Sequence, residues 1–236
     1  MIIVINPKYN QLTSFIKSIP DIFPTQGNVI YNERNQLKTF IIDGYNIVVK
    51  SFRKPNVTNK IVYGNFRKSK AKRSFENALK LLDKGFSTPD PIAYIQEKKF
   101  GLFSRSYYIS IYEIDYKHIR EQMIGQNVTD EFLCDVANLI ARLHNEGILH
   151  KDLSPGNILT RQINNTLEFS LVDINRMIFQ NKISKKIRFK SFKRLSENEK
   201  IITQIAKFYA AATNLDESES IEKIKKYSSR FISSKK

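Results

Sequence analysis

The segment that most constrains this chain is His150-Lys151-Asp152-Leu153-Ser154-Pro155-Gly156-Asn157. An apolar helical pattern precedes it, and Ile158-Leu159 follow it. Its core is a His-x-Asp unit with an Asn five residues after the Asp. Phosphoryl transfer to a hydroxyl needs this spacing, because one carboxylate must orient and deprotonate the hydroxyl and an amide oxygen must hold Mg²⁺ on the phosphates. The segment therefore predicts Asp152 as a base and Asn157 as a metal ligand.

Three further parts of such a site lie at suitable places in the chain. The apolar run 169–172 ends in Asp173, as a strand does that presents a second metal carboxylate. Upstream, a strand-like run ends in Lys50, and a helical pattern carries Glu76, an acid that could pair with Lys50. The order Lys, Glu, His-x-Asp with its Asn, and then Asp is that of the kinase fold.

The pattern of the remaining chain predicts an α+β protein with two lobes, residues 1–114 and 115–236. Five alternating or apolar runs predict a five-stranded sheet in the first lobe, namely Val29–Tyr31, Leu37–Ile42, Tyr45–Phe52, Ile92–Lys98 and Ser106–Ile114. Ile16, Ile19 and Phe23 precede them as a short helix or lead-in. One long helix, with Phe75, Ala78, Leu79 and Leu82 as its apolar stripe, completes this lobe.

The second lobe is predicted to be helical. Thr129 is a suitable N-cap for a helix over 130–146, whose core stripe is Phe132, Val136, Ile140 and Leu143. Two more helices are expected over 197–212 and 217–232. Cys134, the single cysteine of the chain, excludes an intramolecular disulfide and fits a reducing compartment. No run approaches the ~20 apolar residues of a membrane span.

The formal net charge is +16. Such a surplus indicates an anionic partner without choosing between nucleic acid, a membrane surface and a phosphorylated substrate. The cations gather in two basic segments. One precedes Glu76 and contains Arg67, Lys68, Lys70, Lys72 and Arg73; the other, at 182–194, contains Lys185, Lys186, Arg188 and Lys190. In the second segment the cations alternate with Ile183, Ile187, Phe189 and Phe192, so it could also insert apolar side chains into a lipid surface.

The chain resembles the bacterial lipopolysaccharide core kinases, the Kdo and heptose kinases of the protein-kinase-like superfamily. The resemblance rests on Val48-Val49-Lys50, the segment 67–79 with Glu76, the loop 150–157, and Asp173-Ile174-Asn175-Arg176-Met177. It covers residues 28–195. The chain departs from protein kinases at the turn 32–35, which lacks the usual glycines, and after Asp173, where no activation segment follows.

The resemblance implies ATP, Mg²⁺ and a sugar hydroxyl on a lipid-linked anionic glycan. Asp152 would be the base, Asn157 and Asp173 the metal ligands, and His150 a structural support. The nucleotide would be bound by Lys50 on its phosphates with Glu76 holding Lys50, and by Val48, Glu113, Ile114 and Leu159 around the adenine. The basic segments would contact the acceptor or the inner face of the inner membrane. We expect a monomeric cytoplasmic protein that is peripheral at that membrane and binds no nucleic acid.

Two other interpretations remain open from the sequence. A small atypical protein kinase of the RIO kind is permitted, because such enzymes also lack an activation segment. A non-catalytic kinase-like binding module is the second. Retention of Lys50, Asp152, Asn157 and Asp173 argues against it, since a module without activity has no chemical need for all four.

Overall fold

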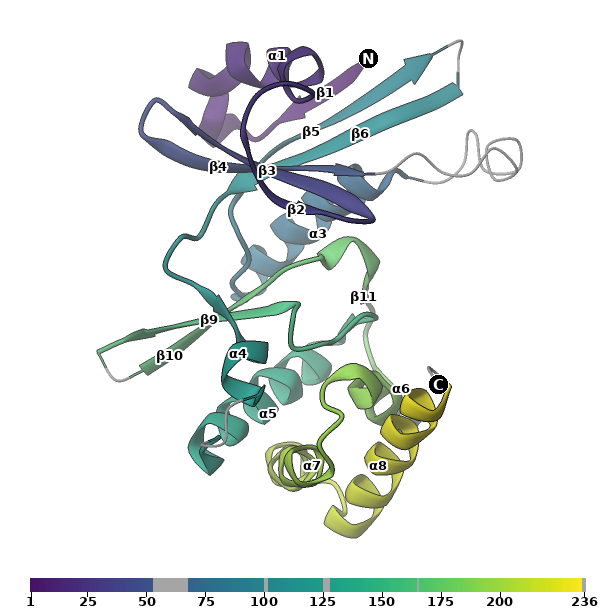
Figure 1. Ribbon diagram of the computed structural model, residues 1–236. Coiled ribbons are helices and arrows are strands. Elements are labelled where there is room, and N and C mark those ends of the chain that lie inside the picture. The colour runs from purple at the N-terminus through teal and green to yellow at the C-terminus, as the bar shows by residue number, and fades with distance from the viewer. Residues whose placement is uncertain (53–67, 100–101, 125–127, 165, 235–236) are drawn as a thin grey trace. The chain divides into compact units, whose positions relative to one another are not determined.

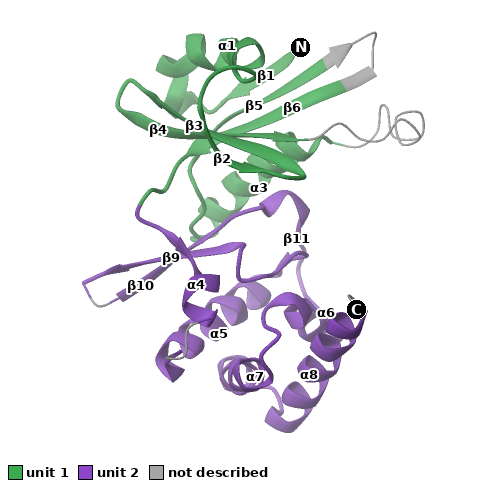
Figure 2. Cartoon of the chain, in the orientation of Figure 1, with its two compact units in different colours: residues 1–114 green, residues 115–236 purple. Residues whose placement is uncertain are grey.

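The structure is a computed structural model, which describes residues 1–52, 68–99, 102–124, 128–164 and 166–234. The chain divides into two compact units, Met1–Ile114 and Asp115–Lys236 (Figure 2). The first is built on a large sheet and the second mainly on helices, which confirms the predicted α+β class. In the described ranges, no helix is long and apolar enough to cross a bilayer.

The sheet of the first unit has the strand order β1-β5-β6-β4-β3-β2 in the described part of the chain (Figure 1). All of its neighbouring strands are antiparallel. The strands are β1 (Ile2–Ile5), β2 (Asn28–Asn32), β3 (Asn35–Ile42), β4 (Tyr45–Phe52), β5 (Pro91–Lys99) and β6 (Leu102–Ile111). The predicted five-stranded sheet is thus wrong by one strand. β1 is too short to show a period, and it becomes a strand by pairing with the outer edge of β5.

One face of this sheet is covered by the N-terminal helices η1 (Pro7–Leu12) and α1 (Thr13–Ile22). Ile16 and Ile19 are fully buried there, as the lead-in pattern predicted. The C-terminal end of α1 is held by a buried lysine. Lys38 Nζ donates to the carbonyls of Phe23 at 2.7 Å and Gln26 at 2.9 Å, which satisfies carbonyls that the helix end leaves open.

The other face is covered by α3 (Lys70–Asp83), which begins after the N-cap Ser69. Ala71 and Phe75 of the helix pack on Phe52, Tyr94 and Tyr108 of the strands. The predicted stripe was partly wrong. Leu81 is fully buried, whereas Leu79 and Leu82 are 41% and 39% exposed, because the helix turns its 71–75–78 row toward the sheet.

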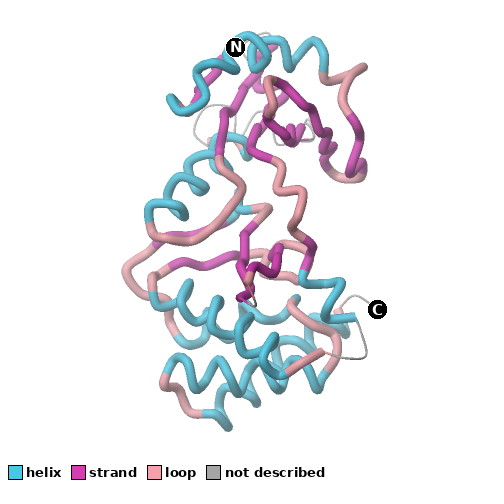
Figure 3. Tube along the Cα trace, turned by 90° about the vertical axis from the view of Figure 1, so that its left-hand side faces the viewer, coloured by secondary structure: helices cyan, strands magenta, loops and turns pink. Residues whose placement is uncertain are grey.

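The second unit contains α4 (Ile119–Ile124), α5 (Asp130–Asn145), α6 (Lys185–Ser191), η3 (Phe192–Arg194), α7 (Glu199–Thr213) and α8 (Glu217–Ser233) (Figure 3). α5 packs on α7, and α7 packs on α8. Thr129 caps α5 as predicted, accepting from the N–H of Phe132 at 3.2 Å. All four residues of the predicted core stripe of α5 are buried.

Short strands of the second unit frame the loop that carries the motif. β8 (Ile148–His150) leads into the loop, and β9 (Ile158–Ile163) leaves it, with β9 between β7 (Lys117–His118) and β10 (Thr166–Leu171). η2 (Ile174–Arg176) follows β10, and β11 (Met177–Phe179) pairs with β8. Gly147 permits this pairing, because a Cβ there would lie 1.7 Å from the carbonyl oxygen of Gln180. Backbone pairing therefore joins the loop 150–157 to the segment around Asp173 on both sides, through β8 with β11 and through β9 with β10.

Candidate active site

The loop 151–157 is anchored by His150, which is 2% exposed. Its Nδ1 accepts from the backbone N–H of Asp152 at 3.2 Å, and its Nε2 lies 3.0 Å from the carbonyl oxygen of Val172. An accepting Nδ1 assigns the proton of the neutral ring to Nε2, which then donates to Val172. Burial lowers the pKa of His150 and keeps the ring neutral. His150 thus ties the backbone of Asp152 to the strand that ends at Asp173.

Asn157 makes the second tie within the loop. Its Nδ2 donates to the carbonyl oxygen of Asp152 at 2.8 Å, and its own carbonyl accepts from the N–H of Val172 at 3.0 Å. Because the amide group is planar, a donating Nδ2 that faces the loop directs Oδ1 away from it. That oxygen is of the type that Mg²⁺ prefers.

Asp173 lies in the left-handed backbone region, with φ of 54°, directly after the residue to which both His150 and Asn157 are bonded. The buried Asn175 donates to its Oδ1 at 2.9 Å. A carboxylate and an amide oxygen on adjoining segments fit a Mg²⁺ that takes its other ligands from water and phosphates. Among the described residues, no group of three or more His, Cys, Asp or Glu side chains is placed so that it could hold a metal ion. A Mg²⁺ bound by one carboxylate, one amide oxygen, water and phosphates does not require such a group.

The Asp152 carboxylate is held by two arginines. Its Oδ2 lies 2.8 Å and its Oδ1 3.0 Å from Nη1 of Arg176, and Oδ1 lies 2.9 Å from Nη1 of Arg194. The side chain of Asp152 is 15% exposed, whereas those of Arg176 and Arg194 are 55% and 40% exposed. The sequence motifs predict a role at the base for neither arginine. Arg176 stood in a motif, and Arg194 was one cation among several in a basic segment.

In the first unit, Val48 and Lys50 alternate with the buried Ile47 and Val49 and so lie on the α3 face of the sheet. The Lys50 ammonium is 5.4 Å from the ring centre of Phe52, which packs against α3. Glu76 of α3 forms ion pairs with Lys68 at 2.8 Å and with Lys72 at 3.9 Å. Its expected pairing with Lys50 stays a prediction.

The remaining expected nucleotide ligands lie in different elements. Glu113 and Ile114 end the first unit, where Ile114 is 58% exposed, and Leu159 is half-buried on β9 opposite Ser170. Their contact with adenine stays a prediction. Of the first basic segment, Arg67 lies outside the described residues, whereas Lys70 and Arg73 lie in the first turn of α3 together with Lys72.

The second basic segment differs from the expectation. Ile183, Phe189 and Phe192 are at most 2% exposed and belong to the core of the second unit, so they are not available for insertion into lipid. Ile187, 41% exposed, is the exception in this set. The physical reason is that α6 and η3 pack on α8, which takes their apolar face.

Arg188 of this segment has a structural role in place of the expected acceptor or membrane contact. Its Nη2 donates to the carbonyl oxygen of His144 at 3.1 Å, its Nη1 to Asn145 Oδ1 at 2.8 Å, and its Nε to the carbonyl of Ile183 at 3.1 Å. The guanidinium therefore caps the C-terminal end of α5, where carbonyls lack helical partners. Lys185 lies 3.2 Å from Glu219, while Lys186 and Lys190 are exposed.

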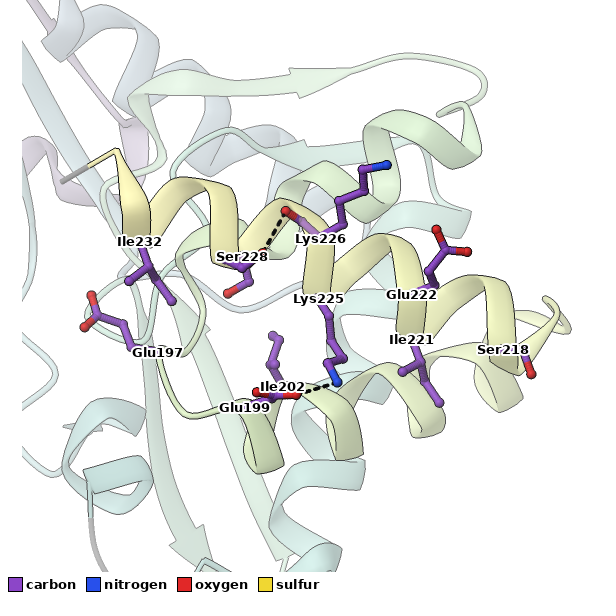
Figure 4. Close-up of a pocket in the computed structure, with 11 residues that line it drawn as sticks. Glu197, Glu199, Ile202, Ser218, Ile221, Glu222, Lys225, Lys226, Ser228 and Ile232 are labelled. Atoms are coloured by element: carbon purple, nitrogen blue, oxygen red, sulfur yellow. Dashed lines mark hydrogen bonds and ion pairs between the residues drawn. The ribbon is translucent and has the colours of Figure 1, made fainter. Parts of the chain in front are cut away.

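A groove of about 740 Å³ lies between α7 and α8, away from the motif residues (Figure 4). Its lining includes Ile202, Ile221 and Ile232, and the ion pair between Lys225 and Glu199, at 2.5 Å, crosses it. None of the predicted site residues lines this groove. We assign it no part in the chemistry.

Comparison with known proteins identifies the fold and the family. A solved structure described as "WaaP in complex with acyl carrier protein" matches 98% of this chain and 99% of its own, with a TM-score of 0.67 and 14% identity. This match shows the protein-kinase-like fold. No curated protein sequence matches the chain.

The sequence also matches the lipopolysaccharide kinase (Kdo/WaaP) family over residues 31–212. This span is more than half of the chain and includes Lys50, Glu76, the loop 150–157 and Asp173. The chain is therefore an ATP-dependent phosphotransferase with an alcohol group as acceptor, and it belongs to the lipopolysaccharide kinase (Kdo/WaaP) family.

Proposed function

We propose that this protein transfers the γ-phosphoryl group of MgATP to a hydroxyl of Kdo or heptose in the lipopolysaccharide inner core. The observation that supports this best is the hydrogen-bonded frame of the motif residues. His150 and Asn157 each bond both to Asp152 and to Val172, so the base and the carboxylate of Asp173 are fixed on one frame. A fixed frame matters because phosphoryl transfer depends chiefly on positioning and charge stabilisation.

In this proposal each residue has a simple task. Asp152 accepts the hydrogen of the sugar hydroxyl and aims its oxygen at the γ-phosphorus. Asn157 Oδ1 and Asp173 would hold Mg²⁺, which neutralises charge on the phosphates when bound. Lys50 binds the α- and β-phosphates, and Glu76 steadies Lys50 from α3. Val48, Glu113, Ile114 and Leu159 surround the adenine.

The alternative of a protein hydroxyl as acceptor is tested by the same assay. Transfer of labelled phosphate from ATP is measured with Kdo–lipid A, with heptosylated core and with a generic protein substrate. We expect transfer to one of the two glycolipids and a loss of about 10²–10⁴-fold for Asp152→Ala, the usual scale for a base and positioning group. Transfer to the protein substrate alone would replace the sugar proposal, and turnover by Asp152→Ala at the wild-type rate would contradict the base assignment.

We further propose that the protein works as a monomer at the cytoplasmic face of the inner membrane, where a lipid-linked acceptor lies. Among the described residues, the candidates for contact with anionic headgroups are Lys68, Lys70, Lys72, Arg73, Lys185, Lys186 and Lys190. The net charge of +16 favours such a surface.

The solved WaaP structure holds an acyl carrier protein, a partner that the sequence did not predict. We extend this partner to the present chain as a proposal, in which the positive charge of the chain draws the partner by electrostatic attraction. Calorimetry with purified acyl carrier protein at low and high salt tests it. Binding that weakens with salt is expected, and no heat of binding at low salt would remove this partner.

A further inference from the structure

The base Asp152 lies in a cluster that carries excess positive charge. One carboxylate faces two guanidinium groups, at 2.8 Å from Arg176 and 2.9 Å from Arg194, so the formal charge of the cluster is positive. The neighbouring His150 adds no charge to it, because burial keeps that ring neutral. A single arginine would suffice to orient the carboxylate. The second one brings a positive charge that an anion can neutralise.

The hydrogen-bond donors of the two arginines lead to the same conclusion. A guanidinium has five N–H donors, and a carboxylate has about four lone-pair positions. Arg176 and Arg194 each reach Asp152 through Nη1 alone. Because their side chains are 55% and 40% exposed, the other nitrogens can meet a ligand that approaches Asp152.

Arg194 is also well placed by the C-terminal part of the chain. Its neighbours Phe192 and Leu195 are fully buried, and the Phe192 ring packs 4.8 Å from that of Tyr209 on α7. The Arg194 guanidinium lies 5.1 Å from the ring centre of Phe231 on α8. Helices beyond the kinase-like motifs thus hold a cation against the base. This arrangement suits recognition of a ligand, since little mobility is lost on binding.

We propose that Arg194, together with Arg176, forms a seat for an oxyanion of the acceptor next to the hydroxyl that Asp152 activates. This inference rests on the proposed function only in taking the acceptor to be an inner-core sugar. The oxyanion is a carboxylate or a phosphate group, either of which matches the planar fork of a guanidinium. On binding, the anion takes the N–H donors of Arg194 that do not reach Asp152. The Asp152 carboxylate has about four lone-pair positions, so it can still accept from the acceptor hydroxyl. Arg194 therefore selects anionic acceptors over neutral ones.

The kinetic test compares Arg194→Gln with Lys193→Gln. Lys193 is a matched control, because it is on the same short helix and lies 5.5 Å from the same Phe231 ring, with no bond to Asp152. For an acceptor with its anion intact, we expect Arg194→Gln to raise KM about 10- to 100-fold, the scale of a lost charge-assisted hydrogen bond. When the acceptor anion is masked as an ester, the two variants should have similar KM values. ATP hydrolysis without acceptor should be unchanged in the control Lys193→Gln.

Two kinetic results would overturn the proposal. If Arg194→Gln lowered kcat equally for the intact and the masked acceptor with KM unchanged, Arg194 would act only by positioning Asp152. If it also slowed ATP hydrolysis without acceptor, the guanidinium would act on the γ-phosphoryl group. Arg194→Lys, which keeps the charge, should recover part of the affinity and shows whether the Gln variant merely failed to fold.

A binding test keeps the inference falsifiable even if no phosphate transfer to lipopolysaccharide is found. Free Kdo, its methyl ester and a hexose phosphate are titrated into the full chain and followed by NMR shifts. We expect the wild type and Lys193→Gln to bind an acid form more tightly than the ester, and Arg194→Gln to lose that preference. Preference for Kdo alone would identify the carboxylate, and preference for the hexose phosphate alone would identify the phosphate. No preference in the wild type would refute the seat while leaving the proposed transfer to its own assay.

Discussion

At the scale of single residues, the site depends on a few short polar contacts. His150 and Asn157 both fix the backbone of Asp152, and both reach the residue before Asp173. The left-handed conformation of Asp173, which is uncommon for residues other than Gly, Asn and Asp, turns its side chain out of the strand direction.

The first prediction concerns Asp173. Asp173→Asn should weaken MgATP binding strongly, because a neutral amide replaces the charged ligand in the proposed metal site. Calorimetric titration with ATP, with and without Mg²⁺, measures the change. Asp21→Asn, which removes an exposed carboxylate from α1, should bind MgATP as the wild type does. Equal MgATP affinity in the Asp173 variant and the wild type would move the metal site elsewhere.

The second prediction concerns pH and His144. Burial, aided by the charge of Arg188, lowers the pKa of His144 to about 3 from its ordinary 6.5. The unfolded chain therefore takes up a proton on His144 between pH 6.5 and pH 3, whereas the folded chain does not. The contribution of the buried neutral His144 to the free energy of unfolding is therefore complete above pH 6.5. It falls with decreasing pH, by at most about 1.4 kcal/mol per pH unit.

Replacing His144 removes its contribution to the pH dependence of the free energy of unfolding. In urea unfolding at pH 7 and pH 5, His144→Gln should be less stable than the wild type at pH 7, because the 2.8 Å bond to Tyr209 and the ring packing change. The difference between the two proteins should shrink at pH 5. His150, whose pKa is also lowered by burial, is present in both proteins and cancels. A constant difference would show that His144 does not titrate on unfolding.

At the scale of elements, the C-terminal part of the chain supports the motif. α6 and η3 lie on α8, and through them Arg188 reaches the end of α5 and Arg194 reaches Asp152. α5 in turn packs on β8, which leads into the motif loop. The basic segment is therefore an integral part of the second unit, and its cations have separate tasks.

The third prediction tests the role of Arg188 as a helix cap. Arg188→Gln should lower the free energy of unfolding by about 1.5–3 kcal/mol, the scale of hydrogen bonds to a charged group. Lys190→Gln on the same helix removes an exposed cation and should change stability by less than about 0.5 kcal/mol. Chemical denaturation at pH 7 measures both. If the two variants were equally stable, the Arg188 cap would make no measurable contribution to stability. Arg188 would then again be a candidate for contact with an anionic surface.

At the scale of the whole molecule, the charge of +16 is distributed over both units. Part of it is neutralised locally, as at Lys185 with Glu219 and Lys225 with Glu199. Cations without such a partner are the ones that an anionic surface attracts. This consideration narrows the proposed membrane contact of α6 to Lys186 and Lys190, with Ile187 exposed between them.

The fourth prediction tests this contact. The double variant Lys186→Gln, Lys190→Gln should bind anionic liposomes more weakly, with a loss of about 1 kcal/mol per cation at low salt. The control Lys200→Gln, Lys207→Gln removes the same charge from exposed positions of α7. Cosedimentation at low and high salt measures both. Equal losses in the two double variants would make the attraction a matter of net charge alone, and binding indifferent to salt would exclude an electrostatic contact.

Local signals in the chain were sufficient to predict several parts of the fold and the site. Alternation predicted β3 and β4, the spacing of apolar residues predicted the buried stripe of α5, and Thr129 marked the start of that helix. The family and the class of reaction followed from the motif residues around Asp152 and Asp173, because the chemistry needs those side chains at those distances along the chain.

Other features depend on contacts between segments far apart in the chain, so they could be recognised only in the folded molecule. β1 is a strand because β5 offers it an edge, and α3 turns Ala71 and Phe75 inward because the sheet presents Tyr94 and Phe52 to them. Arg194 meets Asp152 from a position 42 residues later. In a segment that mixes cations with apolar residues, the spacing of the apolar residues predicts an apolar face. It does not predict which element packs against that face. The packing of η3 on α8 buried Phe192 and placed Arg194 at the base.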